Sequence, residues 1–168
     1  MSPARLWASF FINPAIALMD SYRLKPFPFI VACKNILSSL LNLNREINVE
    51  YDWLVETFPD CHRIFRTLQR AAIVEHAAIA AAFLIVTNLA RRSITEVTLR
   101  GDKADYFLDG RKYLLEISGT ESTMLFAWRY RKKIRQLQAN PHRRDGYVFV
   151  CCFSNQRARF SFHRNEPA

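Results

Sequence analysis

A helical segment at 122–139 lies between two strand-like segments, and this arrangement constrains the fold most. The segment before it is RKYLLEISG at 111–119, and the segment after it is the apolar run GYVFVCCFS at 146–154. Neighbouring parallel strands need a crossover connection of a dozen or more residues, which is usually a helix. A continuous apolar run of strand length is typical of a strand covered on both faces. The sequence therefore predicts an α/β fold with a parallel pair inside its sheet.

Further strands are predicted on both sides of this pair. Residues 94–100 (ITEVTLR) alternate and are rich in β-branched residues, as strands commonly are. Residues 104–110 (ADYFLDG) end in Asp109-Gly110, a strong hairpin signal that turns the chain into the segment at 111–119. Residues 157–164 (RARFSFHR) alternate as a last strand. From residue 71 the expected order is helix, three strands, helix, strand, strand.

The first part of the chain is predicted to be helical, because all four glycines lie after residue 100. We expect a helical N-terminal region at 1–70 and an α/β core at 71–168. The apolar segment at 71–90 contains an uninterrupted run of only 10 residues, Ala77–Val86, fewer than the roughly 20 that a bilayer crossing needs. It is therefore predicted to be a buried core helix, with no membrane span. The expected helices of this part are 4–20, 29–43, 50–70 and 71–92.

The charge of the chain points to a polyanionic partner. Lys and Arg number 24 against 15 Asp and Glu, which gives a net charge of +9. Nucleic acid and an anionic membrane surface both satisfy such a balance, and the excess of Arg over Lys favours nucleic acid, because guanidinium groups fork onto phosphate and stack on bases. A basic protein without a polyanionic partner is the alternative. With 50% hydrophobic residues the chain is expected to fold rather than stay disordered.

The cysteines show no metal-binding or disulfide pattern. Cys33, Cys61, Cys151 and Cys152 form no C-x-x-C pair and have no zinc-finger spacing to histidine. Reduced, buried thiols are typical of cytosolic proteins. The first 25 residues lack the features of a signal peptide. The expected location is cytoplasmic.

Two carboxylates are candidates for chemistry. Side chains at i and i+2 of a strand share a face, so Lys112, Glu116 and Ser118 are expected on one side of the strand at 111–119. Glu116 then lies in mid-strand among apolar neighbours, where an ionised carboxylate must be paired, protonated or bound to a metal. The hairpin brings Asp105 close to it. A divalent cation is a common reason for two carboxylates to meet.

Both acids also have structural explanations. Glu116 could pair with Arg100 or Arg111, and Asp105 could open a strand or cap a turn. Glu75, near the start of the helix at 71–92, could simply complement the helix dipole.

The order helix, strand, strand, strand, helix, strand carries an acid in Ala104-Asp105-Tyr106 and an acid-x-small set in Glu116-Ile117-Ser118. This combination resembles the restriction-endonuclease-like PD-(D/E)XK nuclease superfamily over residues 71–162. The resemblance implies that Asp105 and Glu116 bind Mg²⁺ or Mn²⁺, with the carbonyl of Ile117 as a further ligand and Glu75 as an additional acid. Ser118 departs from the pattern, because active members commonly have a catalytic lysine there.

Loss of that lysine bears on activity, because electrostatic stabilisation of this kind is worth several kcal/mol of barrier. Lys112 or Lys103 could supply the missing charge in space. The expected function is a metal-dependent nucleic-acid phosphodiesterase that acts on DNA more than on RNA. Its catalytic activity could be impaired by the absence of the lysine at position 118. The alternative is a catalytically inactive nuclease-fold module that binds nucleic acid or a protein partner. The N-terminal region could also mediate homo-oligomerisation.

The helix at 122–139 is the expected nucleic-acid surface. Its apolar stripe contains Ala127, Tyr130, Ile134 and Leu137, and its other side carries basic residues around an aromatic side chain. Basic residues interleaved with an exposed aromatic suit phosphate contacts and base stacking. A solvated helix face whose Trp packs on a neighbour is the alternative. The predicted contact residues are Trp128, Arg129, Lys132, Arg135, Arg143 and Arg144.

Overall fold

The computed structural model describes residues 3–24, 26–37, 42–51, 63–98 and 104–165. Its helices are α1 (Pro3–Asp20), α2 (Ile64–Thr67), α3 (Arg70–Ile85) with the π-helical continuation η3 (Val86–Ala90), and α4 (Thr123–Gln138). Its strands are β1 (Phe27–Lys34), β2 (Ile36–Leu37), β3 (Asn42–Leu43), β4 (Glu46–Tyr51), β5 (Ile94–Val97), β6 (Tyr106–Leu108), β7 (Tyr113–Thr120), β8 (Gly146–Cys152) and β9 (Arg157–His163).

The fold is α/β, built on a seven-stranded mixed sheet in the order β4-β1-β9-β8-β7-β6-β5. β7 and β8 are parallel and are joined through α4, as predicted, and every residue of β8 is buried. β5, β6 and β7 are antiparallel neighbours. The turn between β6 and β7 has positive φ angles at Asp109, Gly110 and Arg111, which explains the glycine at its centre.

The prediction of a helix at 29–43 is wrong, and so is that of a wholly helical N-terminal region. β1 pairs with β4 on one side and with β9 on the other, so residues before 70 share a sheet with the rest of the chain. The physical reason lies in the period of burial: Phe27, Phe29, Val31 and Cys33 are buried and alternate with more exposed residues.

The expected helix at 50–70 is wrong at its start, and only a short helix is found near its end. Its first residues belong to β4, which ends at Tyr51, and 52–62 lie outside the described residues. α2 covers only Ile64–Thr67. The strand predicted at 94–100 is confirmed as β5 for Ile94–Val97.

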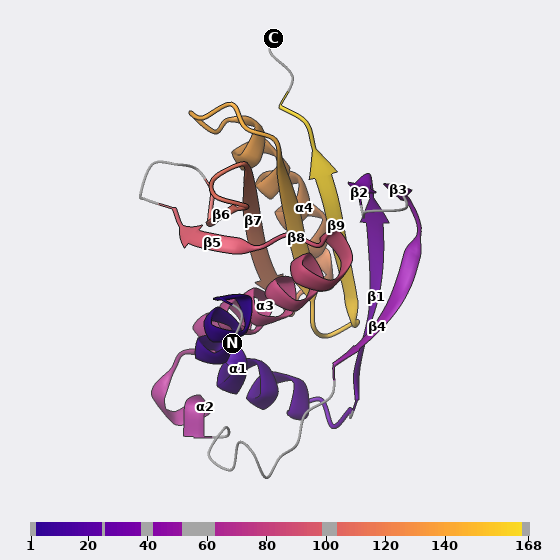
Figure 1. Cartoon of the computed structure of the whole chain (residues 1–168). Helices are drawn as coiled ribbons and strands as arrows, with labels where there is room; N and C mark the ends of the chain where they lie inside the picture. Colours follow the sequence, from indigo (N-terminus) through magenta and orange to yellow (C-terminus); the bar gives the residue numbers. More distant parts are fainter. Residues whose placement is uncertain (1–2, 25, 38–41, 52–62, 99–103, 166–168) are drawn as a thin grey trace.

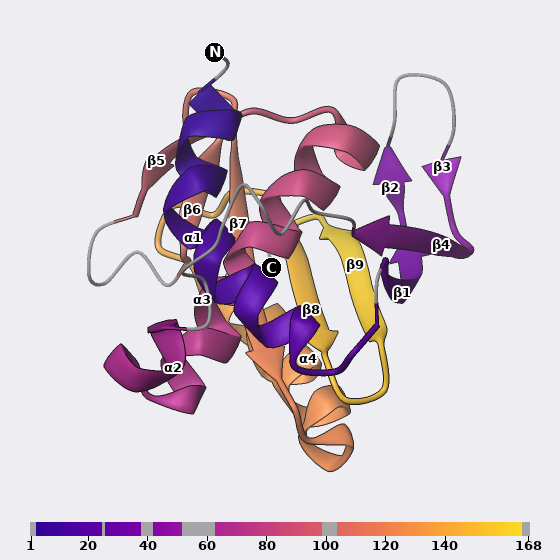
Figure 2. The same cartoon turned by 90° about the horizontal axis from the view of Figure 1, so that it is seen from below.

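Helices cover both faces of the sheet (Figure 1). α3 packs on one face against β7 and β8, and α1 packs on α3, as the view from below also shows (Figure 2). α4 packs on the opposite face against the same two strands. A second, smaller apolar cluster lies beneath α4 and contains Phe107, Leu114, Phe126, Leu137, Val148, Val150 and Cys152.

The stretch Arg70–Ala90 is long and apolar enough to cross a membrane by length and composition, with a mean hydropathy of 1.8. More than half of that window (56%) is buried inside the protein, against the sheet and α1. A helix that is apolar nearly all round is also the form that a central core helix takes.

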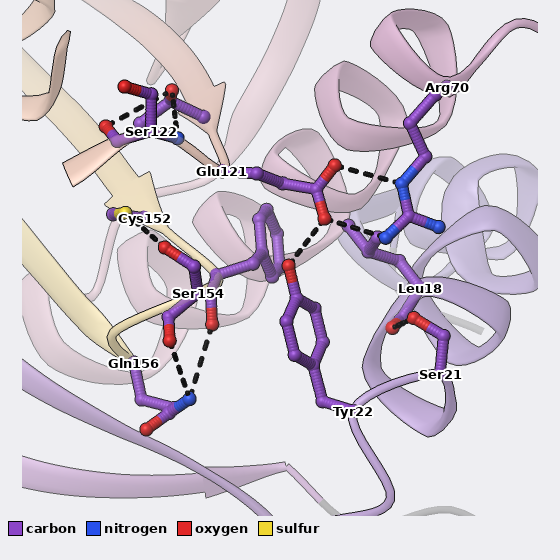
Figure 3. Close-up of polar contacts among 11 residues, drawn as sticks. Leu18, Ser21, Tyr22, Arg70, Glu121, Ser122, Cys152, Ser154 and Gln156 are labelled. Carbon is purple, nitrogen blue, oxygen red and sulfur yellow. Dashed lines mark hydrogen bonds and ion pairs between the residues drawn. The ribbon is translucent and has the colours of Figure 1, made fainter. Parts of the chain in front are cut away.

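A polar network joins the N-terminal helix to the end of β7 (Figure 3). The Glu121 carboxylate accepts hydrogen bonds from the Tyr22 hydroxyl and from Arg70, whose Nε and Nη2 lie 2.8 and 2.6 Å from Oε2 and Oε1. The next residue, Ser122, caps α4 by accepting the Leu125 amide. The network therefore fixes α1 and α3 at the point where the chain enters α4.

Gly119 lets α3 approach β7 closely, and this contact generates a prediction. A Cβ at this position would lie 2.6 Å from the Val74 carbonyl oxygen and 2.8 Å from Ala78 Cβ. We expect Gly119→Ala to lower the free energy of unfolding by about 1–3 kcal/mol in urea denaturation. Gln138→Ala, at an exposed position of α4, should change it by less than about 0.5 kcal/mol. Equal effects of the two substitutions would contradict this packing.

Candidate active site

Asp105 lies directly before β6, and its carboxylate binds the neighbouring strand. Its amide donates to the Leu115 carbonyl at 3.1 Å, and its Oδ2 accepts the Ile117 amide at 2.6 Å. The Asp105 carboxylate thus accepts the Ile117 amide of β7 at a position that no residue of β6 pairs with. About a third of the Asp105 side chain (34%) stays exposed, so the site is open to solvent at this residue.

Glu116 lies in the middle of β7, with only 1% of its side chain exposed. In the register of the sheet it is opposite Val148 of β8. Its face of the sheet is the one covered by α4, since Leu114 on the same face belongs to the cluster beneath that helix. The sequence prediction of a carboxylate buried among apolar neighbours is therefore confirmed.

Lys133 of α4 joins the two acids. Its Nζ lies 3.0 Å from Asp105 Oδ2 and 2.5 Å from Glu116 Oε2, and 16% of its side chain is exposed. One ammonium group therefore neutralises one of two negative charges, and the cluster keeps a net charge of about −1 when both acids are ionised. Neither acid is locked to an arginine of its own among the residues that the structure describes.

The electrostatics of the cluster follow from its burial. Burial raises the pKa of Glu116 to about 7, with a further contribution from Asp105, although Lys133 opposes both. Burial lowers the pKa of Lys133, but the two carboxylates outweigh it, so the net pKa of Lys133 is raised. Lys133 is therefore charged at neutral pH, whereas Glu116 exchanges its proton there.

Ser118 follows Glu116 on the same face of β7 and is 6% exposed. Its hydroxyl accepts a hydrogen bond from Arg129 Nη1 at 3.1 Å. Arg129 is therefore directed toward the sheet, not toward the outer face of α4 where the sequence pattern put it. Arg129 and Lys133 are about one helical turn apart and lie on one side of α4. Ser118 and Glu116, their partners, are two residues apart and lie on one face of β7.

The other predicted catalytic residues lie apart from this cluster. Lys112 is in the exposed turn before β7, and its Nζ lies 5.3 Å from the centre of the Tyr113 ring. That ring packs on Tyr147 and Phe162, on the face of the sheet opposite to Glu116. The prediction that Lys112 shares the face of Glu116 is therefore wrong. Lys103 lies outside the described residues.

Glu75 is exposed on α3. It is near enough to contribute, after burial and Asp105, to the raised pKa of Tyr106. It has no described contact with Asp105 or Glu116. Within the described ranges no group of three or more His, Cys, Asp or Glu side chains has the arrangement of a metal site, so Glu75 does not join the two acids. The amide of Ile117 contacts Asp105, and a role for its carbonyl stays a prediction.

Two carboxylates nevertheless suit a magnesium ion. Mg²⁺ usually keeps several waters and is held by one or two carboxylates together with substrate phosphates. The Lys133 ammonium contacts Asp105 and Glu116 at the same time, so the two carboxylates share one cation. Asp105 and Glu116 are the residues that would hold the metal.

The predicted nucleic-acid residues differ in how far they are exposed. Trp128 is 50% exposed with Lys132 Nζ 5.1 Å from its ring, and Lys132 and Arg135 are also exposed. Trp128 therefore does not pack on a neighbouring segment as a core residue. Arg143 is exposed in the loop after α4, whereas Arg144 lies over the Phe107 ring, 5.8 Å from its centre. Arg129 is directed toward the sheet, where it donates to the Ser118 hydroxyl.

Searches against protein-family models, curated proteins and solved structures gave no significant match to this chain. The function is therefore inferred from the site itself.

Lys133 is the site residue that sequence analysis missed, although a signal for it exists. On a helix that advances about 100° per residue, Lys133 lies about 40° from Leu137 and about 60° from Tyr130, two members of the predicted apolar stripe. A lysine at the border of a buried face can bury its stem while its ammonium reaches water or a polar partner. Glu116, in the middle of the strand that precedes this helix, is such a partner.

The raised pKa of Glu116 predicts a pH dependence of stability. A carboxyl group whose pKa is raised in the folded state contributes stability below its ordinary value of 4.5, and this contribution is lost as the pH rises to about 7. We expect wild type to lose on the order of 3 kcal/mol relative to Glu116→Gln across this window, with no further change above it. Urea denaturation of both proteins between pH 4 and pH 8 measures the difference. A constant difference would contradict the burial of an ionisable Glu116.

Proposed function

We propose that the protein is a metal-dependent nucleic-acid phosphodiesterase with a restriction-endonuclease-like core. The observation that carries this proposal is the meeting of Asp105, Glu116 and Lys133 at one point. Further support comes from the order α3, β5, β6, β7, α4, β8, β9, with β7 and β8 parallel and the acids on β7 and just before β6. This order agrees with the resemblance drawn from the sequence.

In this proposal Lys133 takes the role of the lysine that is missing at Ser118. A divalent metal held by Asp105 and Glu116 would supply Lewis-acid polarisation of the scissile phosphate and a lowered pKa for an attacking water. Asp105, which is about a third exposed, would hold the metal on the solvent side, and the buried Glu116 would hold it from below. Lys133 contributes a positive charge beside both acids, where it stabilises negative charge that develops on the phosphate.

The outer face of α4 is the proposed nucleic-acid surface. α4 contains no acidic residue, and its outward side chains include Lys132, Arg135 and the half-exposed Trp128. Cations on such a face bind phosphates by releasing counterions, and an exposed indole offers a surface for base stacking. The expected substrate is DNA more than RNA, and the expected location of the protein is cytoplasmic.

One observation favours the alternative of a catalytically inactive module. The Lys133 ammonium already donates a hydrogen bond to each carboxylate, so the cluster has a counterion without any metal. In that case the protein binds nucleic acid or a protein partner through the same fold but does not hydrolyse it.

The proposal predicts a loss of activity on substitution of one lysine and no loss on substitution of another. Lys133→Met should reduce the rate of cleavage of DNA in Mg²⁺ or Mn²⁺ by roughly 100-fold or more, because it removes a charge acting on the transition state. Lys112→Met, the matched substitution in the exposed turn, should leave the rate within about twofold of wild type, and Glu116→Ala should abolish cleavage. The measurement is nicking of supercoiled and linear DNA under single-turnover conditions.

One result would contradict the nuclease activity, and another would contradict the role of Lys133. If wild type nicks no DNA or RNA with any divalent metal while it still binds nucleic acid, the inactive module is the better account. If Lys112→Met and Lys133→Met lose activity equally, the assignment of Lys133 is wrong.

Binding by α4 predicts a change in salt dependence. Lys132→Gln and Arg135→Gln should each weaken DNA binding and reduce the slope of log K against log salt by about 1, because each phosphate contact releases about one counterion. Arg66→Gln, exposed on α2 on the other side of the sheet, should leave the slope unchanged. Fluorescence anisotropy of a labelled oligonucleotide at several salt concentrations measures all three. Unchanged slopes in the α4 variants would exclude this face as the binding surface.

A further inference from the structure

Arg129 has an unusual environment for a guanidinium group. Its Nη1 donates to the Ser118 hydroxyl at 3.1 Å, while its Nε is buried and has no hydrogen-bond partner. The residue as a whole is only partly buried. A guanidinium has five N–H donors, and a single neutral hydroxyl satisfies one of them.

Four other arginines of the described chain form ion pairs with carboxylates. Arg129 forms no ion pair within the described residues, and the two acids on its side of the sheet are bound by Lys133. A partly buried charge without a counterion costs free energy, and an anionic ligand would lower this cost. The paired arginines are Arg70 with Glu121, Arg92 with Asp109, Arg111 with Glu96, and Arg157 with Glu46.

We propose that Arg129 binds a phosphate group of the substrate and that Ser118 holds the guanidinium in position for it. This inference rests on the proposed function, whose substrate it defines at one point as an anionic phosphodiester. Guanidinium groups bind phosphate oxygens through two parallel N–H donors, and this geometry suits a group whose remaining donors are unsatisfied. Arg129 is four residues, or about 6 Å, from Lys133 along α4. The phosphate that it binds therefore lies next to the cluster of Asp105, Glu116 and Lys133.

This arrangement gives Ser118 a function of its own. A lysine at 118 would bring a second ammonium group against the Arg129 guanidinium, which like-charge repulsion opposes. A serine instead accepts the hydrogen bond of the guanidinium and adds no charge. The cations of the site thus come from α4, and the strand supplies the acid and the anchor.

The test uses inorganic phosphate as the probe, without metal and at constant ionic strength. Phosphate in place of chloride should raise the midpoint of thermal unfolding of wild type, because a ligand that binds only the folded state stabilises it. Arg129→Met should lose most of this increase. It should also unfold in chloride at a midpoint equal to or higher than that of wild type, because it removes a charge without a counterion. Arg131→Met, an exposed arginine on the same helix, should keep the full increase.

Ser118→Ala provides a second variant that removes one hydroxyl and is expected to fold. It should reduce the phosphate response, because the guanidinium loses its anchor. The inference is overturned if Arg129→Met keeps the response, or if both variants are destabilised in chloride while their response to phosphate equals that of wild type. The latter result would make the Arg129–Ser118 contact purely structural.

The outcome is separable from that of the proposed function. If phosphate binding requires Arg129 but no nucleic acid is cleaved with Mg²⁺ or Mn²⁺, the phosphate site stands and the nuclease proposal fails. If cleavage requires Lys133 while Arg129→Met has an unchanged KM and kcat, the nuclease proposal stands and the role of Arg129 is refuted.

Discussion

The contact of one ammonium group with two carboxylates determines how this site is organised. Asp105 arrives before β6, Glu116 from the middle of β7 and Lys133 from α4, so three separate elements must be in place before the charges are balanced. A buried Glu116 without Lys133 would be a costly charge, and Lys133 without the acids would be equally unfavourable in its partly buried position. The β6–β7 hairpin and the parallel β7–α4–β8 unit therefore depend on each other electrostatically as well as through apolar packing.

The same interaction connects structure to the proposed chemistry. A cluster with two acids and one lysine carries an excess negative charge when both acids are ionised, and its solvent-facing member is Asp105. Both properties suit the binding of a divalent cation. Arg129, bound to Ser118 one turn away, adds a positive charge on the same side of the sheet, where the substrate of a phosphodiesterase has its negative charge.

The second half of the fold was predictable from sequence because its signals are local. Asp109-Gly110 fixes the hairpin, the apolar run at 146–154 marks a central strand, and the intervening helix requires a parallel pair. β1 was missed because its alternation over Phe27–Lys34 is short and lies among apolar residues, and its partner strand β9 is far away in sequence. Glu116 was found through strand periodicity and Asp105 through the hairpin that brings it close to Glu116. Lys133 was not, because its role depends on how α4 is rotated against the sheet, and helix–sheet packing sets this rotation.

A crystal structure of the protein soaked with Mn²⁺ tests the central claim most directly. Our account predicts an anomalous peak bound to the carboxylates of both Asp105 and Glu116, with the Lys133 ammonium displaced from between them. The absence of any peak at saturating Mn²⁺, with Lys133 still bound to both carboxylates, would contradict a metal-dependent site and leave the cluster as an ion network that stabilises the fold.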